Sequence, residues 1–300
     1  MRYLDLYNSG ELHRRVKAAY ARLRSCDLCP FDCRVNRLAG ETGVCRSGAH
    51  AKVASTNVHR GEEPPISGSR GSGTIFFSNC NLACRFCQNF PISQFGNGEE
   101  MTTRELASRM LKLQRQRVHN INLVTPSHFL PQFLAAFYLA VKEGFRLPIV
   151  WNSNGYERGD ALELMDGIVD IFLPDMKYAA GEPAMNFSSA PTYPAINRLA
   201  VKEMLRQVGH LRLDGEGIAV KGLIVRHLVL PEGNAGSRET LHWITDNLGE
   251  ETHISLMRQF FPAHLAAGTQ GIQRKISAEE YEDAVEALEE AGLENGWVQE

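Results

Sequence analysis

The sequence lacks several features that would place it in an obvious class. Positive charge is not in excess, because 32 Lys and Arg face 35 Asp and Glu and the net charge is −3. No apolar run approaches the roughly 18 residues needed to span a bilayer, and the N-terminus has no apolar core of a secretory signal. We therefore expect a cytoplasmic protein that binds neither nucleic acid nor membrane.

Cysteine is missing from most of the chain, and no cysteine follows Cys87. The count of seven is odd, the spacing is tight and there is no export signal, which together argue against a disulfide framework. Thiolates that cluster in a reducing compartment usually hold a soft metal or an iron–sulfur cluster. The seven divide into a four-cysteine group (Cys26, Cys29, Cys33 and Cys45) and a three-cysteine group (Cys80, Cys84 and Cys87).

The chain changes character near residue 72. Before it, residues 8–24 predict an amphipathic helix with a solvated basic face, and the four-cysteine group follows in a loop-rich segment. Residues 61–73 are rich in Gly, Pro and Ser and indicate a boundary. We expect an N-terminal helix and metal-binding segment over 1–72 and a second domain over 73–300.

From residue 74, short apolar runs alternate with amphipathic stretches, and capping boxes begin at Thr102 and Ser277. This alternation predicts a parallel sheet with crossover helices. About six β/α units fall short of the eight in a closed barrel. The expected fold is an α/β partial (β/α)6 barrel with an N-terminal cysteine-rich extension. The expected strands are 74–77, 121–124, 148–151, 170–173, 222–230 and 254–257, and the expected helices between them include 129–143, 157–166, 193–208 and 237–248.

The three-cysteine group follows the first expected strand of this domain, with spacings of three and two residues. Such spacing lets a loop turn three sulfurs toward one point. A [4Fe–4S] cluster normally takes four thiolates, so three leave one iron with an open coordination position. The end of a barrel strand is also where barrel enzymes place active sites. A structural zinc loop is the less favoured alternative, because zinc sites usually pair two ligand dyads.

This segment resembles the signature of the radical S-adenosylmethionine superfamily, C-x-x-x-C-x-aromatic-C, with Phe86 as the aromatic residue. The resemblance implies an oxidoreductase in which S-adenosylmethionine binds the open iron through its amino and carboxylate groups. It implies that an electron from an external donor of the flavodoxin or ferredoxin type breaks the S–C5′ bond. The 5′-deoxyadenosyl radical then takes a hydrogen atom from a substrate.

Three further segments resemble the strand ends of pyruvate formate-lyase activating enzymes. These are Trp151-Asn-Ser-Asn-Gly-Tyr156, Leu173-Pro-Asp-Met-Lys177 and Val225-Arg-His-Leu-Val-Leu-Pro231. The resemblance implies that Ser153, Asp175, Lys177 and Arg226 contact S-adenosylmethionine. The usual Gly-Gly-Glu segment is replaced by Val124-Thr-Pro-Ser-His128. Thr125 and backbone carbonyls there are the available acceptors for the methionyl amine, and His128 either faces the substrate or packs in the core.

The motifs around the four-cysteine group, together with Gly-Glu-Glu-Pro-Pro-Ile-Ser-Gly at 61–68, resemble the PflX-like group related to those activating enzymes. The four thiols predict either a structural zinc site or a second iron–sulfur centre, with Gly40 and Gly43 permitting tight turns. His59, Glu62 and Glu63 lie between the cysteine groups. They either reach over the barrel mouth toward the substrate or, as we favour, form a solvated linker charge.

The sequence thus predicts an enzyme that cleaves S-adenosylmethionine reductively and abstracts hydrogen from an unidentified substrate. The first hypothesis is an activase-like protein that acts on a polypeptide and places a glycyl radical. One alternative is a radical enzyme that modifies a small molecule or a peptide. Another is a non-enzymatic iron–sulfur or zinc carrier.

Overall fold

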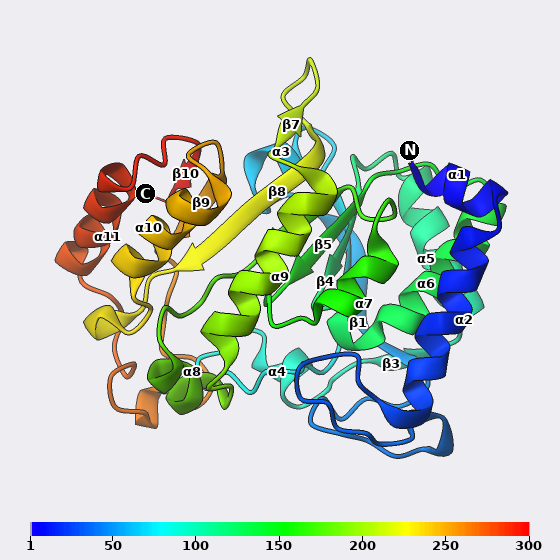
Figure 1. Cartoon of the computed structure of the whole chain (residues 1–300), viewed down its shortest axis with the longest axis horizontal. Helices are drawn as coiled ribbons and strands as arrows, with labels where there is room; N and C mark the ends of the chain where they lie inside the picture. Colours follow the sequence, from blue (N-terminus) through cyan, green and yellow to red (C-terminus); the bar gives the residue numbers. More distant parts are fainter. Residues whose placement is uncertain (1, 300) are drawn as a thin grey trace.

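The computed structural model describes residues 2–299, so Met1 and Glu300, the outer ends of the two expected segments, lie outside the described residues. Within that range the strands are β1 (Ala51–His59), β2 (Ser72–Phe77), β3 (Glu99–Met101), β4 (Ile121–Val124), β5 (Ile149–Ser153), β6 (Ile171–Pro174), β7 (Arg212–Leu213), β8 (Ala219–Leu228), β9 (His253–Met257) and β10 (Gly296–Val298). They form one sheet in the order β10-β9-β8-β6-β5-β4-β2-β1-β3, and β7 pairs with β8 beside that path (Figure 1).

Helices cover this sheet and connect its strands. The α-helices are α1 (Arg2–Asn8), α2 (Glu11–Ala21), α3 (Pro64–Ser67), α4 (Phe90–Ser93), α5 (Thr103–Arg115), α6 (Leu130–Lys142), α7 (Gly159–Leu162), α8 (Gly181–Ser188), α9 (Tyr193–Val208), α10 (Ser237–Leu248) and α11 (Ala278–Glu290). Short 3-10 helices are η1 (Arg22–Ser25), η2 (Arg37–Ala39), η3 (Ser127–Phe129), η4 (Glu163–Met165), η5 (Pro231–Gly233) and η6 (Ala266–Gly268).

The six expected strands are present as β2, β4, β5, β6, β8 and β9, and they run parallel to one another. The sheet stays open, with β10 at one edge and β3 at the other, so the α/β partial barrel is confirmed. Capping boxes begin α5 at Thr102 and α11 at Ser277, as their sequences predict. The expected helix over 157–166 is shorter, because α7 passes into the 3-10 helix η4.

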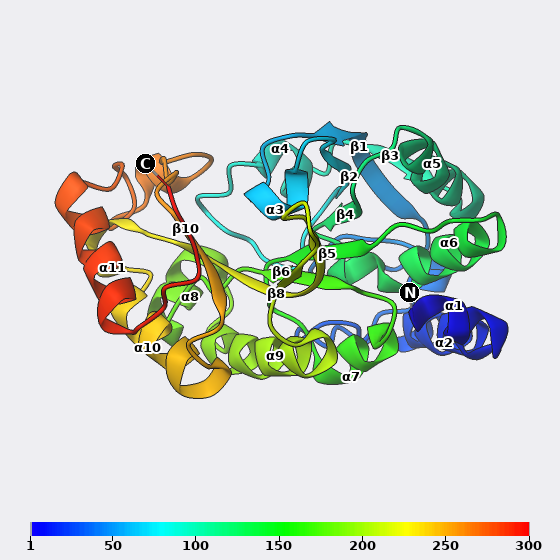
Figure 2. The same cartoon turned by 90° about the horizontal axis from the view of Figure 1, so that it is seen from above.

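The central strands are buried along their whole length, which explains their unbroken apolar sequences. Every residue of β5 and β6 is buried. Figure 2 shows α7 and α9 along one face of the sheet, with α5 and α6 toward one end and α10 and α11 toward the other. Strands enclosed on both faces read as continuous apolar runs, not as alternating ones. Loops at the carboxyl ends of the strands are therefore free to carry polar chemistry.

The N-terminal segment contributes a strand that the sequence did not predict. β1 pairs antiparallel with β2, and β3 pairs antiparallel with β1. The Gly- and Pro-rich stretch 61–73 holds α3 and the first residues of β2. The division at residue 72 stays a prediction, but both sides of it contribute to one sheet.

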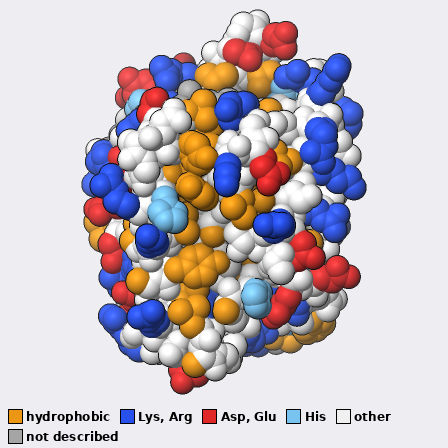
Figure 3. Space-filling model, turned by 90° about the vertical axis from the view of Figure 1, so that its right-hand side faces the viewer, with side chains coloured by type: hydrophobic (Ala, Val, Ile, Leu, Met, Phe, Trp, Pro, Cys, Tyr) orange, Lys and Arg blue, Asp and Glu red, His pale blue; other side chains and the backbone are white. Residues whose placement is uncertain are grey.

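Helix α2 packs on α6 through Leu12 and Ala19, which are fully buried, and leaves Arg14 and Lys17 exposed. This agrees with the solvated basic face expected for that helix. On the same side of the molecule, basic side chains flank a band of apolar ones (Figure 3). Among the helices of residues 2–299, each one is too short or too polar to span a bilayer.

Candidate active site

One cavity of about 220 Å³, here called the central cavity, opens at the carboxyl ends of the parallel strands. Barrel enzymes carry their active sites at this end of the sheet. Its lining brings together every residue that the resemblance assigns to the cluster or to S-adenosylmethionine, although their roles remain predictions. These residues are Cys80, Cys84, Phe86, Cys87, Thr125, Ser153, Asp175, Lys177 and Arg226.

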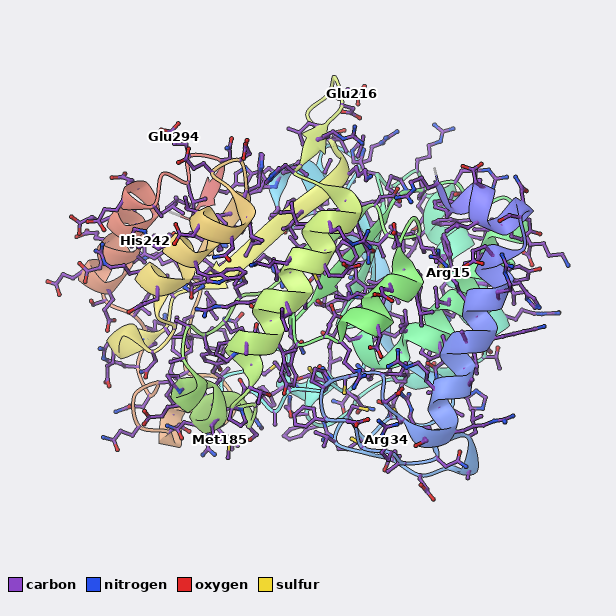
Figure 4. The ribbon with its side chains drawn as sticks, in the orientation of Figure 1. Arg15, Arg34, Met185, Glu216, His242 and Glu294 are labelled. Atoms are coloured by element: carbon purple, nitrogen blue, oxygen red, sulfur yellow. The ribbon has the colours of Figure 1, made fainter. Side chains whose placement is uncertain are left out.

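The loop after β2 delivers the three-cysteine group to this cavity. Asn79 has a φ of 68°, a left-handed conformation that asparagine tolerates better than most residues. Its side-chain amide donates to the carbonyl of Arg46 at 3.2 Å and to Ser47 Oγ at 3.1 Å, which ties the loop to the N-terminal segment. In Figure 4, sulfur atoms gather at the lower edge of the molecule, where the N-terminal loop marked by Arg34 meets α4.

Each of the three sulfurs lies beside a polar group. Asn154 Nδ2 donates to Cys80 Sγ at 3.3 Å, and Ser188 Oγ donates to Cys84 Sγ at 3.0 Å. Ser93 Oγ lies 3.0 Å from Cys87 Sγ. Hydrogen bonds to cluster sulfurs stabilise their negative charge and tune the reduction potential. No local pattern indicates a role for Ser188, which is distant in the chain, while Asn154 lies in a segment singled out for another reason.

Burial controls the protonation of these thiols. It raises the pKa of Cys80 to about 12 and that of Cys84 to about 11, and the ammonium of Lys177 opposes the rise at Cys84. A thiolate is thus unfavourable here unless a cation compensates its charge, and iron or zinc does so. Among residues 2–299, no group of three or more His, Cys, Asp or Glu side chains is already arranged to hold a metal. Three sulfurs with polar donors and a nearby cation nevertheless fit a cluster chemically.

Three charged residues form a network in the same cavity. Asp175 accepts hydrogen bonds from Lys177 Nζ at 2.5 Å and from Arg226 Nε at 3.0 Å, and Arg226 also donates to Asn152 Oδ1 at 3.0 Å. Burial raises the pKa of Asp175, but the two cations outweigh it and hold the pKa below its ordinary value. The network therefore carries one net positive charge at neutral pH.

Ser153 is held by a carboxylate that the sequence analysis missed. Its Oγ donates to Glu157 Oε2 at 3.0 Å and accepts from the backbone N–H of Gly155 at 3.2 Å. Glu157 also accepts from Trp151 Nε1 at 2.9 Å. Gly155 has a φ of 70°, and a Cβ there would lie 2.5 Å from the carbonyl oxygen of Asp175, so only glycine fits this turn.

Thr125 and His128 occupy different environments. Thr125 lines the central cavity with a φ of 56°, and its backbone N–H donates to the carbonyl of Asn152. His128 is 1% exposed and donates through Nε2 to the carbonyl of Ser78 at 2.9 Å. Burial lowers the pKa of His128 to about 3, so the ring is neutral. His128 was expected either to face the substrate or to pack in the core, and the structure supports packing in the core.

The four-cysteine group forms a second cluster of thiols. Burial is the largest cause that raises the pKa of Cys29 to about 12, and the thiols of Cys45, Cys26 and Cys33 raise it further. The turn between Cys33 and Cys45 needs glycine at position 43, because a Cβ there would lie 2.6 Å from Cys33 Sγ.

Arg37 supplies positive charge to this cluster. The side chain is 1% exposed and donates to the carbonyls of Gly48 and His128, at 2.8 and 2.7 Å, and to Cys26 Sγ at 4.0 Å. Since its partners are neutral carbonyls and a sulfur, thiolates are the natural counter-charge for this guanidinium. The donor set therefore fits a metal held by four thiolates.

The expectation of a solvated charge at Glu62 and Glu63 is wrong. Glu63 is only 9% exposed, and burial raises the pKa of Glu62 to about 7. Both line a cavity of about 640 Å³, here called the outer groove, which adjoins the central cavity. Both residues directly precede the short helix α3 and face the outer groove, a tertiary effect that local composition does not report.

Comparison with known proteins agrees with this geometry. The pattern of the Radical SAM superfamily matches residues 74–213. An uncharacterized protein of Methanocaldococcus jannaschii, MJ0674, is 30% identical over 97% of this chain and 82% of its own length. A radical SAM methyltransferase from Sphaerobacter thermophilus has a crystal structure that matches with a TM-score of 0.49 and 12% identity. That match covers 75% of this chain and 66% of the other, just under two thirds of its length.

The family pattern covers β4 to β6, most of β2 and the loop of the three-cysteine group, while Arg226 and Met257 of the central cavity lie beyond it. The relative extends the similarity to the four-cysteine group and the C-terminal strands. The chain therefore contains, at residues 74–213, a domain of the radical SAM superfamily, whose enzymes work with a [4Fe–4S] cluster, S-adenosylmethionine and an electron from an external donor.

Proposed function

We propose that Cys80, Cys84 and Cys87 hold the [4Fe–4S] cluster and that the central cavity binds S-adenosylmethionine. The observation that carries this proposal is the convergence of the three thiols and the charged network in a single cavity. When bound, the two cofactors supply a 5′-deoxyadenosyl radical that abstracts a hydrogen atom from the substrate.

The charged network orients S-adenosylmethionine. Lys177 and Arg226 attract its carboxylate, because two cations share the single carboxylate of Asp175. Asp175 has lone pairs left to accept from the ammonium or from ribose hydroxyls. Ser153 and Thr125 add hydroxyl groups on the neighbouring strand ends. Loss of any one of these partners leaves a buried charge or hydroxyl unpaired.

Phe86 shields the reacting centre from water. It is 5% exposed, and its ring packs against Tyr178 and Phe260 at centroid distances of 6.5 and 5.8 Å. An apolar wall beside the cysteines keeps water away from a reactive species and strengthens the electrostatic contacts inside the cavity.

The four-cysteine group, on this proposal, holds a second metal, as zinc or as an iron–sulfur centre. Four thiolates close the coordination shell, which is typical of a structural site. Arg37 balances part of their charge. Metal analysis of Cys26→Ala beside Cys80→Ala identifies the metal, because each variant loses the metal of one group only.

A polypeptide substrate, as for an activase-like protein of the PflX-like group, is the finer form of this proposal. The outer groove supports it, because its lining runs from the central cavity to the edge strand β10, where Val298 is 45% exposed. A chain segment can enter from that edge. Transfer of deuterium from a labelled polypeptide to 5′-deoxyadenosine supports this form, while transfer only from small molecules contradicts it.

The proposal as a whole is tested by anaerobic reconstitution with iron and sulfide, followed by dithionite and S-adenosylmethionine. We expect 5′-deoxyadenosine from the unmodified protein and none above background from Cys84→Ala. Equal amounts from both proteins would overturn the assignment of the three-cysteine group and favour a metal carrier.

A further inference from the structure

The outer groove continues the central cavity toward the N-terminal segment. Six residues line both hollows, which makes them one continuous space. They are Asn89, Val124, Asn152, Arg226, Met257 and Gln259. Any molecule that reacts at the central cavity and extends outward must pass along this groove.

Two carboxylates from one short segment lie in its wall. Glu63 is 91% buried, since only 9% of its surface is exposed, and within residues 2–299 its Oε2 has no hydrogen-bond partner. Glu62 lines the same groove, and the two carboxyl groups are close enough for one to influence the other. A buried carboxylate oxygen without a donor is unfavourable, so its presence indicates a missing cationic or hydrogen-bonding partner.

Within residues 2–299, no cationic side chain donates a hydrogen bond to this oxygen. Arg226 lines the groove and attracts both carboxylates through its charge, but its hydrogen bonds go to Asp175 and Asn152 instead. Burial raises the pKa of Glu62 to about 7, with Glu63 raising it further and Arg226 lowering it. The two carboxyl groups thus lie close together where burial disfavours their charge, and a bound cation would stabilise both.

Apolar side chains form part of the walls between these carboxylates and the central cavity, among polar ones. Val124 and Met257 line the shared part, and Phe76 and Trp297 line the outer part. The aliphatic part of a substrate packs on these apolar side chains, while a cationic group pairs with the carboxylates.

We propose that the outer groove is the substrate site and that Glu62 and Glu63 bind an alkylammonium or guanidinium group of the substrate. The adjoining carbon chain then lies along Val124 and Met257 toward the central cavity. The cation is either a free amine or guanidine or the side chain of a Lys or Arg in a polypeptide. This inference rests on the proposed function, since it makes the groove the approach to the radical site.

The test is calorimetric titration of the anaerobically reconstituted protein in the presence of S-adenosylmethionine. The probes are pentylammonium, pentylguanidinium and the neutral isostere pentylurea. A second arm uses acetyl-Gly-Arg-Gly-amide and its citrulline counterpart, which separates a polypeptide source from a free cation. We expect the cationic member of at least one arm to bind tenfold or more tightly than its neutral isostere.

The variants Glu63→Gln and Glu62→Gln should each weaken that cation at least tenfold and leave the neutral probe unaffected. The control Glu286→Gln, on the exposed face of α11, should bind as the unmodified protein does. Thermal unfolding checks the fold of each variant, and Glu62→Gln carries the test if Glu63→Gln does not fold. Equal binding of cationic and neutral probes, or unchanged affinity in folded carboxamide variants, would overturn the inference.

Formation of 5′-deoxyadenosine by the unmodified protein is measured in the same preparations. Absence of that product alongside selective cation binding would contradict the proposed function and leave the cation site standing. Product formation without cation selectivity would contradict the cation site alone.

Discussion

The two cysteine groups are built from the same side chain but differ in their surroundings. The sulfurs of the four-cysteine group lie among backbone amides and the buried guanidinium of Arg37. Those of the three-cysteine group line the central cavity, beside the ammonium of Lys177. On the proposed function, the four thiols would close the coordination shell of their metal, and the three would leave a position for a ligand that arrives through the cavity.

His128 connects the two cysteine groups through hydrogen bonds to both sides. Its carbonyl accepts from Arg37 Nη1 at 2.7 Å, and its Nε2 donates to the carbonyl of Ser78, two residues before Cys80. A metal that orders the N-terminal loop therefore also supports the loop of the three-cysteine group. We infer that the four-cysteine group is a stabilising element for the catalytic loop.

The largest expected difference between the groups is in catalysis. Cys80→Ala removes one of three ligands and should reduce 5′-deoxyadenosine formation to background. Cys26→Ala should leave measurable product and iron at the other group, because its metal does not touch S-adenosylmethionine. Product and metal content are measured on matched preparations. Complete loss of product in Cys26→Ala, with iron retained and the fold intact, would break this contrast.

Arg37→Met should lower the free energy of unfolding by about 3 kcal/mol, because it leaves buried carbonyls and thiolates without their cation. The control Arg34→Met removes an exposed arginine that pairs with Asp27 and Asp32, and should cost about 1 kcal/mol or less. Denaturant titration of the metal-loaded proteins measures both. Similar losses of unfolding free energy in the two variants would mean that the buried Arg37 contributes no more than an exposed arginine does.

His128 predicts a pH dependence of stability. Burial lowers its folded pKa to about 3, below the usual value of 6.5, so the unfolded chain binds more protons between these pH values. Stability should therefore fall as pH drops below 6.5, by about 1.4 kcal/mol per pH unit from this residue. His128→Gln should lose that part of the slope between pH 6.5 and 5. An unchanged slope would show that His128 is protonated in the folded protein.

Ser188→Ala should have a smaller, electronic effect. The hydroxyl donates to Cys84 Sγ at 3.0 Å and stabilises negative charge on that sulfur. Its loss should lower the reduction potential by tens of millivolts, since the reduced cluster carries more negative charge. Redox titration followed by EPR detects this shift, with the exposed Ser69→Ala as control. A potential that rises or stays fixed would contradict the hydrogen bond's assigned effect.

The sequence predicted the features that depend on local patterns. The six parallel strands are apolar runs, and the helices that start at Thr102 and Ser277 begin with the four-residue capping-box pattern. Both features can therefore be predicted without tertiary information. The convergence of Asp175 and Arg226 also follows from topology, because neighbouring parallel strands end at the same edge. The two residues meet although they lie far apart in the sequence.

What could not be predicted depends on contacts between distant segments. Strand β1 has a mixed polar sequence and is fixed by its pairing with β2 and β3. Ser188 reaches Cys84 only through the position of α8. Glu62 and Glu63 look like solvated charges in the sequence, because the residues that surround them in the outer groove come from distant segments of the chain.

The central claim is that the three-cysteine group holds a cluster with an open iron that S-adenosylmethionine occupies. EPR spectra of the dithionite-reduced, anaerobically reconstituted protein, recorded before and after addition of S-adenosylmethionine, test it most directly. The account predicts a [4Fe–4S] signal that changes on addition in the unmodified protein and in Cys26→Ala, and no signal that responds to S-adenosylmethionine in Cys80→Ala. A signal indifferent to S-adenosylmethionine, or zinc in place of iron at Cys80, Cys84 and Cys87, would contradict it.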